Sequence, residues 1–528
     1  MRQSERQTLA IQRDGRILLD TSVPESQTVE DRLRTFAELR SAAGQVHTYR
    51  VTDVSLWAAA ASNVCEQEII ETLHLNASSR IPRDLEVRIS RFFERYGHVR
   101  LTGSPGDLCL TCDDPLLMRE IGRVLGRQSR NGVIPIEEEE RGQVKAVLAQ
   151  AGYPVQDTVL ARISGTAVYE LDRSVRLRDY QSRAVARFVD HATTGGLILL
   201  PCGAGKTVVG VAIAAELQAR VLIVTPNRTI GEQWANHFVQ MTSLGPADIS
   251  LFDNADGERP VTILTYQGLT GSHNGISARL SNAGDVPWGL VIYDEVHTLP
   301  AEVFRQSAAL QASRRLGLTA TLVREDGREG EVYALVGPPV WQSRWRDLER
   351  DGWISPVECV EVRIRPEYDH VTEERGLASK IRTVHRLIHR HTNDHVLVAA
   401  HRIKEVYALA RSIGAPAITG RTPQSERQRL YAAFRSGEIR TLVVSRVANV
   451  GVDLPDANVL IQVSGTFGSR LEEAQRLGRL LRPNKSSTGP ARFYSLVLPM
   501  TKDRTFAERR QRFLVDQGYR YHVVNARA

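Results

Sequence analysis

Residues 196–207 read Gly-Leu-Ile-Leu-Leu-Pro-Cys-Gly-Ala-Gly-Lys-Thr, and this stretch decides the fold of the central part of the chain. An apolar run ends in a glycine-bearing turn, and Lys206 and Thr207 then lead into residues 208–217, which are apolar-rich and typical of a helix. This order predicts a strand that feeds a phosphate-binding loop at a helix N-terminus, where free backbone N–H groups and the helix dipole favour an anion. Lys206 would reach the terminal phosphates, and Thr207 would hold Mg²⁺. Leu200 stands where the general pattern has its first glycine, and the alternative is a plain glycine-rich turn.

A second stretch, residues 290–297, reads Leu-Val-Ile-Tyr-Asp-Glu-Val-His. An apolar strand here delivers Asp294 and Glu295 at its C-terminal end, which is the edge where parallel sheets bind ligands. Asp294 would hold Mg²⁺ through its water shell, and Glu295 would polarise the attacking water. The alternative is a chance acidic turn. His297 either packs in the interior or links the nucleotide to the second half of the chain.

The chain downstream of Thr207 alternates Val-, Ile- and Leu-rich runs with helical stretches. This pattern predicts an α/β fold with parallel sheets covered on both faces. The expected strands of a first sheet are 221–225, 261–265, 289–294 and 315–319, and those of a second are 396–400, 417–419, 441–445, 459–463 and 493–497.

The second series of strands contains no second phosphate loop, which suggests that this lobe completes the nucleotide site from across a cleft. The candidates lie in residues 472–482, Glu-Glu-Ala-Gln-Arg-Leu-Gly-Arg-Leu-Leu-Arg. Gln475, Arg479 and Arg482 recur at helical spacing, so all three can face one way. Guanidinium groups aimed at a γ-phosphate stabilise transition-state charge. The alternative is a solvated basic helix face.

Composition limits the remaining possibilities. The 528 residues are 42% hydrophobic and 24% charged, as in ordinary globular proteins, and the length suggests three to four domains. The net charge of +7 permits a nucleic-acid partner without requiring one. Five cysteines are too few for disulfide bonds to stabilise a fold of this size. The polar N-terminus lacks the apolar segment of a signal peptide. We therefore expect a cytoplasmic protein without membrane spans.

The N-terminal part predicts a smaller α+β region. Helices are expected to begin near residue 52 and over 65–75 and 82–96, with two short strands at 99–101 and 108–112, a winged-helix-like succession. Such a module binds DNA or proteins, or serves only for packing. Cys109 and Cys112 have the spacing of half a zinc site, but no second pair accompanies them, which favours a structural interpretation.

These stretches together resemble superfamily 2 helicases, and within them the XPB family of DNA-repair and transcription translocases. The likeness rests on the phosphate loop, on Asp-Glu-Val-His ending at His297, on Leu-Thr-Ala-Thr ending at Thr321, and on Glu-Ala-Gln-Arg-Leu-Gly-Arg ending at Arg479. Arg324-Glu-Asp326 looks like the family's RED motif, and residues 510–519, 47–52 and 95–100 are also similar to the family. The resemblance spans residues 40 to 520 or so.

The resemblance implies two RecA-like lobes behind an N-terminal module and a short damage-recognition-like segment. The expected boundaries are 1–129 for the N-terminal module, 130–172 for the segment, 173–347 for lobe 1 and 348–528 for lobe 2. The implied activity is an ATP- and Mg²⁺-dependent 3′ to 5′ motor that acts on duplex, forked or bubble DNA, in association with the nucleoid and with a nuclease or repair complex.

The resemblance also assigns roles to single residues. It places the adenine at Arg178 and Gln181, the phosphates at Gly203, Ala204, Gly205, Lys206 and Thr207, and the ribose near Asp453. It implies that Thr319 and Thr321 couple hydrolysis to DNA movement, and that Arg324, Glu325 and Asp326 face the duplex fork. Further contacts to the DNA backbone are expected from Arg228, Thr265, Tyr266 and Arg402.

Two departures from the family keep other functions open. The stretch 366–380, where members carry a helical thumb, is short and charged, and the damage-recognition-like segment is also short. One alternative is therefore a duplex translocase that feeds a nuclease without separating strands. Another is a clamp whose ATP cycle only gates attachment to DNA or to a partner. The Asp-Glu-Val-His box and the RED-like loop favour DNA over RNA.

Overall fold

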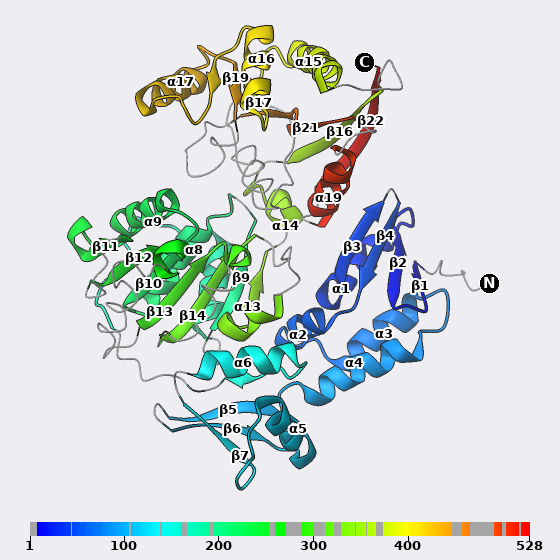
Figure 1. Cartoon of the computed structure of the whole chain (residues 1–528), viewed down its shortest axis with the longest axis vertical. Coiled ribbons are helices and arrows are strands. Elements are labelled where there is room, and N and C mark those ends of the chain that lie inside the picture. Colours follow the sequence, from blue (N-terminus) through cyan, green and yellow to red (C-terminus); the bar gives the residue numbers. More distant parts are fainter. Residues whose placement is uncertain are drawn as a thin grey trace. The chain divides into compact units, whose positions relative to one another are not determined.

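A computed structural model divides the chain into two compact units, residues 1–200 with 205–342, and residues 201–204 with 343–528 (Figure 1). The structure describes every residue except 1–7, 44, 105–106, 138–139, 158, 160–165, 191–194, 202, 253–258, 271–287, 300–309, 311, 321–328, 344, 355, 366–372, 446–456, 465–489, 499–502, 517–518 and 528. None of the described helices is long and apolar enough to cross a membrane.

The first unit begins with an antiparallel sheet of order β1-β2-β4-β3. Its elements, blue in Figure 1, are β1 (Leu9–Ile11), β2 (Arg16–Asp20), α1 (Ser26–Phe36), β3 (Glu38–Ala43), β4 (Val46–Arg50), α2 (Asp53–Ala61), α3 (Glu66–Asn76) and α4 (Arg83–Arg95). Helix α2 begins where it does because of a capping box. The Thr52 hydroxyl accepts from the Ser55 amide at 3.1 Å, and the Ser55 hydroxyl accepts from the Thr52 amide at 2.9 Å.

A second sheet has the order β7-β6-β5-β8. Its elements are β5 (Val99–Ser104), β6 (Asp107–Cys112), α5 (Pro115–Leu125), β7 (Val133–Ile136), α6 (Arg141–Gln150) and β8 (Gln156–Asp157). The predicted succession of three helices and a hairpin is present as α2 to β6, but β7 and β8 extend the hairpin into this larger sheet. The sheet therefore joins residues on both sides of the boundary expected at 129/130, and the four-part division stays a prediction.

The remainder of the first unit is lobe 1, a parallel sheet of order β11-β12-β10-β13-β14-β9-β15. Its strands are β9 (Gly195–Leu199), β10 (Val221–Thr225), β11 (Ile249–Leu251), β12 (Val261–Thr265), β13 (Trp288–Asp294), β14 (Ala312–Thr319) and β15 (Pro339–Gln342). Its helices are α7 (Asp179–Val189), α8 (Lys206–Glu216), α9 (Arg228–Met241), α10 (Tyr266–Thr270) and α13 (Glu329–Val336), with short 3₁₀ turns η2 (Pro246–Asp248) and η5 (Val296–Thr298). Strands β9, β10 and β13 are buried along their whole length, which explains their continuous apolar sequences.

Helix α13 is where the two N-terminal sheets meet lobe 1. The Trp57 ring of α2 lies edge-on to Tyr333 of α13, with ring centroids 5.5 Å apart. The Gln150 amide of α6 donates to the Glu331 carboxylate of α13 at 2.9 Å. These contacts make the first unit one continuous packed body.

The second unit holds lobe 2, a parallel sheet of order β18-β19-β17-β20-β21-β16-β22. Its strands are β16 (Val357–Arg365), β17 (Val396–Ala399), β18 (Ala417–Ile418), β19 (Thr441–Val444), β20 (Val459–Gln462), β21 (Ala491–Val497) and β22 (Arg520–Arg527). Its helices are α14 (Trp345–Arg350), α15 (Glu373–Arg390), α16 (Ile403–Ile413), α17 (Gln424–Ser436) and α19 (Asp503–Asp516). The two seven-stranded parallel sheets confirm the predicted fold class.

Candidate active site

The predicted phosphate loop connects β9 to α8. Gly203 and Gly205 have φ angles of +82° and +79°, which side-chain-bearing residues rarely adopt. The Ala204 amide donates to the Pro201 carbonyl at 3.1 Å and closes a tight turn before α8. Lys206 and Thr207 are the first two residues of α8, so the loop leads directly into the N-terminus of a helix, as the sequence predicts.

Gln181 closes the loop from one side. Its side-chain oxygen accepts from the Arg178 backbone amide at 2.9 Å, and a Cβ atom built on Gly205 would lie only 2.6 Å from its Nε2 atom. The Arg178 guanidinium in turn donates to the Tyr180 hydroxyl at 3.2 Å. Gln181 is buried at the start of α7, so the structure brings this sequence-predicted residue directly against the phosphate loop.

The carboxylates follow on the neighbouring strands. In the sheet order β13-β14-β9, residues Asp294, Thr319 and Leu199 each end their strand, so the segments that follow them leave from one edge. Glu295 comes directly after β13 and has a φ of +50°, an uncommon conformation for a residue other than glycine. Its Oε1 atom lies 3.1 Å from the Lys206 Nζ atom, and both side chains are about nine-tenths buried. Two residues that the sequence predicts to act on one phosphate therefore meet.

Asp294 is held by two residues from other elements. The Trp234 indole N–H of α9 donates to its Oδ2 atom at 2.8 Å, and the Tyr266 hydroxyl of α10 donates to its backbone carbonyl at 2.6 Å. Burial and, next, the nearby Glu295 charge raise the pKa of Asp294, while the Trp234 hydrogen bond and Lys206 lower it, and together these effects bring the pKa to about 6. Sequence reasoning missed Trp234, because a tryptophan on the apolar face of a helix has the pattern of an ordinary core residue.

This donor set suits a divalent cation. A buried carboxylate whose pKa is raised gains stability from a positive charge at its oxygen atoms. The Oε2 atom of Glu295 is buried and, among the described residues, receives no hydrogen bond, as expected of an atom that acts on a bound ligand or water. Thr207 supplies a partly buried hydroxyl at the first turn of α8.

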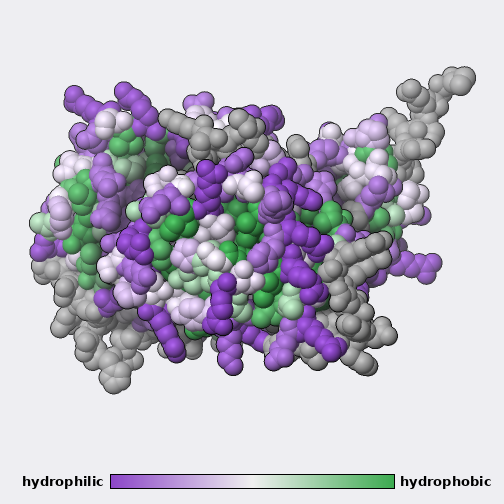
Figure 2. Space-filling view, turned by 90° about the horizontal axis from the view of Figure 1, so that it is seen from above, coloured by the Kyte–Doolittle hydropathy of each residue, from purple (hydrophilic) through white to green (hydrophobic). Residues whose placement is uncertain are grey.

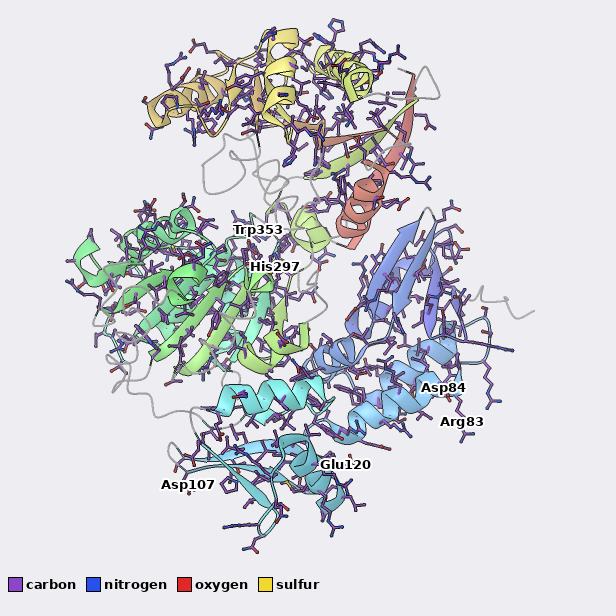
Figure 3. The ribbon with its side chains drawn as sticks, viewed as in Figure 1. Arg83, Asp84, Asp107, Glu120, His297 and Trp353 are labelled. Atoms are coloured by element: carbon purple, nitrogen blue, oxygen red, sulfur yellow. The ribbon has the colours of Figure 1, made fainter. Side chains whose placement is uncertain are left out.

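His297 connects the carboxylates to the next strand. It lies in η5 (Figure 3), and its Nδ1 atom is 2.7 Å from the Thr319 hydroxyl and 3.6 Å from the Glu295 Oε2 atom. This contact runs from the acidic turn to the end of β14, directly before the segment expected to couple hydrolysis to DNA movement. The structure thus joins His297 and Thr319, and their coupling role stays a prediction.

Several predicted site residues lie outside the described part of the chain: Thr321, Arg324, Glu325, Asp326, Asp453, Gln475, Arg479 and Arg482.

One expected DNA contact is wrong. Tyr266 is buried and donates to Asp294, because its hydroxyl reaches the carbonyl at the end of the adjacent strand. Thr265 accepts from the Gly268 amide at 3.0 Å and thereby begins α10. The Arg228 guanidinium lies 4.8 Å from the Phe252 ring centroid, and Arg402 is exposed at the start of α16. A DNA contact by these three residues stays a prediction.

Cys109 and Cys112 lie on β6. Cys109 Sγ is 3.5 Å from the Thr102 hydroxyl on β5, and no group of three or more metal-ligating side chains is found among the described residues. Cys109 thus contacts its partner strand within the sheet, and the structural interpretation of the pair stays a prediction.

Comparison with known proteins places the chain in a family. The family model for the ERCC3/RAD25/XPB C-terminal helicase matches residues 375–528. The DNA 3'-5' helicase XPB of Kineococcus radiotolerans is 42% identical over 541 residues, which cover 98% of this chain and 96% of that protein. The chain belongs to the XPB family.

Other XPB-family members match over almost the same length. The DNA 3'-5' helicase XPB of Mycobacterium tuberculosis is 41% identical, with 98% of each chain covered. The general transcription and DNA repair factor IIH helicase/translocase subunit XPB of Encephalitozoon cuniculi is 32% identical over 97% of this chain and 82% of its own length. The XPB resemblance predicted from the sequence is therefore confirmed.

Two further family models match the first unit, and one solved structure matches the fold. The models describe a helicase conserved C-terminal domain, at residues 9–127, and the res subunit of type III restriction enzymes, at residues 174–324. The DNA-bound ATP-dependent type ISP restriction-modification enzyme LlaBIII has a TM-score of 0.53 at 12% identity and covers 87% of this chain and 41% of its own. At this identity the likeness concerns the fold alone.

Proposed function

We propose that this XPB-family chain is an ATP-driven 3′ to 5′ DNA helicase that couples hydrolysis to movement along duplex DNA and to its opening, in DNA repair. The observation that carries the proposal is the contact between Lys206 and Glu295, 3.1 Å apart beside the phosphate loop. The two bacterial relatives named DNA 3'-5' helicase XPB support the substrate and the polarity.

The chemistry follows from the arrangement in lobe 1. The loop amides and Lys206 would bind the β- and γ-phosphates of ATP, and Gln181 with Arg178 would orient the adenine. Thr207 and Asp294 would hold Mg²⁺, which supplies positive charge to the phosphate oxygens. Glu295 would accept a hydrogen bond from the attacking water and orient it toward the γ-phosphate.

Residues of lobe 2 would complete the reaction. Arg479 and Arg482 would stabilise the charge that develops on the γ-phosphate, Gln475 would contact the same group, and Asp453 would lie near the ribose. Their helical spacing in the sequence and the family resemblance support these roles. The RED-like residues Arg324 to Asp326 would meet the duplex fork.

The proposal has a direct test in strand separation. Wild-type chain is mixed with ATP, Mg²⁺ and forked duplexes that carry a single-stranded tail of either polarity. Unwinding should occur with a 3′ tail, and Glu295→Gln should abolish it while ATP binding persists, because the amide cannot orient the water as a carboxylate does. Unwinding by Glu295→Gln, or unwinding from the 5′ tail alone, would refute the proposal.

A second candidate is a duplex translocase without strand separation. The observation that favours it is that residues 373–380, where a thumb would be expected, form the first turns of α15, and that Lys380 there pairs with Asp503 of α19 at 2.6 Å. These residues are thus part of the packed lobe. Displacement of a triplex-forming strand without fork unwinding would favour this candidate.

A further inference from the structure

The positive charge of the chain is concentrated in one segment of lobe 2. Between Arg375 and Arg411 there are eight lysines and arginines but only two carboxylates, Asp394 and Glu405. This segment therefore has a net charge of +6, against +7 for the whole chain of 528 residues. It comprises most of α15, strand β17 and most of α16.

Helix α15 places its charges on its outer face. Val384 and Leu387 pack into the core of the lobe, whereas Arg382, Arg386 and His389 are exposed. The spacing of three and four residues is that of one helix face. Figure 2 looks onto the side of this unit that carries α15 and α16, and long hydrophilic side chains project from it.

The spacing of these charges works against the helix itself. Arg382, Arg386 and Arg390 repeat at four-residue intervals, and the sequence has no Asp or Glu three or four residues from Arg382 or Arg386. Arg390 has Asp394 four residues after it. Like charges at this spacing repel each other and destabilise a helix. Elsewhere the chain uses opposite charges at the same interval, as in Arg504 with Glu508 at 3.1 Å. Within α15, Arg382 donates to the Ser379 hydroxyl at 3.1 Å and Arg386 donates to the Thr383 hydroxyl at 3.2 Å, and both acceptors are neutral groups.

Helix α16 extends the same surface. His385 of α15 contacts the Ser412 hydroxyl of α16 at 3.0 Å, so the two helices are neighbours. On α16, Lys404, Tyr407 and Arg411 are exposed at intervals of three and four residues. Glu405, the acidic residue between them, instead accepts from the Ser464 hydroxyl at 2.5 Å. We call the exposed set Arg375, Arg382, His385, Arg386, His389, Lys404, Tyr407 and Arg411 the α15–α16 basic face.

We propose that the α15–α16 basic face binds the phosphodiester backbone of duplex DNA, as a contact surface on lobe 2 beyond the residues discussed above. Arg375 and Arg390 are 15 positions apart, which corresponds to about 22 Å of helix, or roughly six base-pair steps of duplex. Backbone contacts carry no base preference, which suits a motor that moves over any sequence. The inference rests on the proposed function, because the basic face would be one part of the surface by which the proposed helicase binds DNA.

The test compares two double variants in the full chain. Arg382→Gln with Arg386→Gln removes two charges from the basic face. Arg429→Gln with Arg435→Gln removes two exposed charges from α17, which lies on the opposite face of the sheet because its crossover runs in the reverse direction. Melting temperatures check that both variants fold, because the first also removes the hydrogen bonds from Arg382 to Ser379 and from Arg386 to Thr383.

Binding to a short labelled duplex is measured between about 50 and 200 mM salt, a range in which phosphate contacts dominate the change in affinity. Each lost contact lowers the slope of log K against log salt by about 0.9, so the α15 variant should lose roughly two units of slope. Its affinity at 0.1 M salt should fall on the order of 10- to 100-fold. The α17 variant should behave as wild type, and phosphate release without DNA should be unchanged in both.

Three results would overturn the inference. If wild-type phosphate release is stimulated by DNA but the α15 variant keeps the wild-type slope, the face binds something else, such as an acidic protein, or is merely solvated, and the proposed function stands. If wild-type phosphate release ignores DNA altogether, the proposed function fails and the inference fails with it. An equal loss of slope in the α17 variant would show a general charge effect and would also contradict the inference.

Discussion

A single side chain, that of Trp234, orients the carboxylate of Asp294 by a hydrogen bond. The two residues are 60 positions apart, and the indole N–H of Trp234 fixes Oδ2 of Asp294 at 2.8 Å. A Cβ atom on Gly210 of α8 would lie only 2.4 Å from the Trp234 ring, so the ring also packs against the helix that follows the phosphate loop. The orientation of a proposed metal ligand thus depends on a residue outside the sequence motifs.

The first prediction concerns this hydrogen bond. Trp234→Phe keeps an aromatic ring but removes the N–H donor, and a hydrogen bond to a charged group contributes about 1.5–3 kcal/mol. We expect ATP turnover to fall roughly 10- to 100-fold at limiting Mg²⁺ and the half-saturating Mg²⁺ concentration to rise. Phosphate release titrated with Mg²⁺ measures both quantities.

Phe238→Leu provides the matched control. The Phe238 ring lies 6.4 Å from the Trp234 ring, so this change disturbs the same packing and leaves the hydrogen bond in place. The control should lose some thermal stability but retain the wild-type Mg²⁺ dependence. A wild-type Mg²⁺ dependence in Trp234→Phe would limit Trp234 to a packing role.

Residues inside a local motif could be predicted, and partners from distant elements could not. The sequence predicts that Lys206 and Glu295 act together, because a lysine that binds the phosphates and a carboxylate that orients the attacking water serve the same hydrolysis reaction. Trp234 and Tyr266 lie close to Asp294 because the strands before α9 and α10 are near β13 in the sheet. The order of the strands in the sheet cannot be read from the sequence. Tyr266 was assigned to DNA for that reason, and the hydrogen bond to the Asp294 carbonyl corrects it.

At the scale of elements, helix α6 is fixed to its sheet by a buried ionic cluster. Asp157 of β8 accepts from Arg141 at 3.0 and 2.6 Å and from Lys145 at 3.0 Å, both on α6. Burial by itself would raise the pKa of Asp157, but Lys145 and Arg141 outweigh it and bring the pKa to about 2. Because α6 also carries Gln150, which contacts α13, the cluster supports the junction with lobe 1.

The second prediction is that Asp157→Asn destabilises the chain in a pH-dependent way. It leaves two buried cations without their carboxylate, which costs about 3–5 kcal/mol at neutral pH. Because the folded pKa lies below the ordinary value of 3.8, the stabilisation by Asp157 is present above that pH and is lost as pH falls toward 2. Urea denaturation should therefore show a large deficit near pH 7 that narrows below about pH 4.

Asp14→Asn serves as the control for this experiment. Asp14 pairs with Arg16 at 2.6 Å, but both side chains are more than half exposed, so solvent screens the pair. Its loss should change the stability little at any pH. A deficit of Asp157→Asn that stays constant down to pH 2 would contradict the charge argument.

Elements with fully buried strands were the most predictable. The bounds of β10 and β12 agree with the sequence prediction, because each is a short run rich in Val, Ile and Leu with a proline next to one end, Pro226 or Pro260. The antiparallel sheet of β1 to β4 was not predicted. The helical spacing of Leu33, Phe36 and Leu39 predicts a helix over residues 30–40, but Leu39 lies in β3, because the extended backbone at Ala37 ends α1 after Phe36.

At the scale of the whole molecule, a motor differs from a clamp in how it uses DNA length. A translocating chain hydrolyses ATP for as long as it moves, so longer duplexes allow more cycles per binding event. We predict that steady-state phosphate release at saturating DNA ends rises with duplex length and then reaches a plateau. Turnover that is independent of length would favour a clamp whose ATP cycle only gates attachment.

The proposed function requires that lobe 1 binds the triphosphate, and we propose that Arg479 of lobe 2 supplies positive charge for its hydrolysis. The most direct measurement is phosphate release, with and without duplex DNA, by wild type, Lys206→Ala and Arg479→Ala. We predict DNA stimulation of the wild type and a loss of roughly 100-fold or more in each variant, with ATP binding retained in Arg479→Ala. Full DNA-stimulated release by either variant would contradict the account.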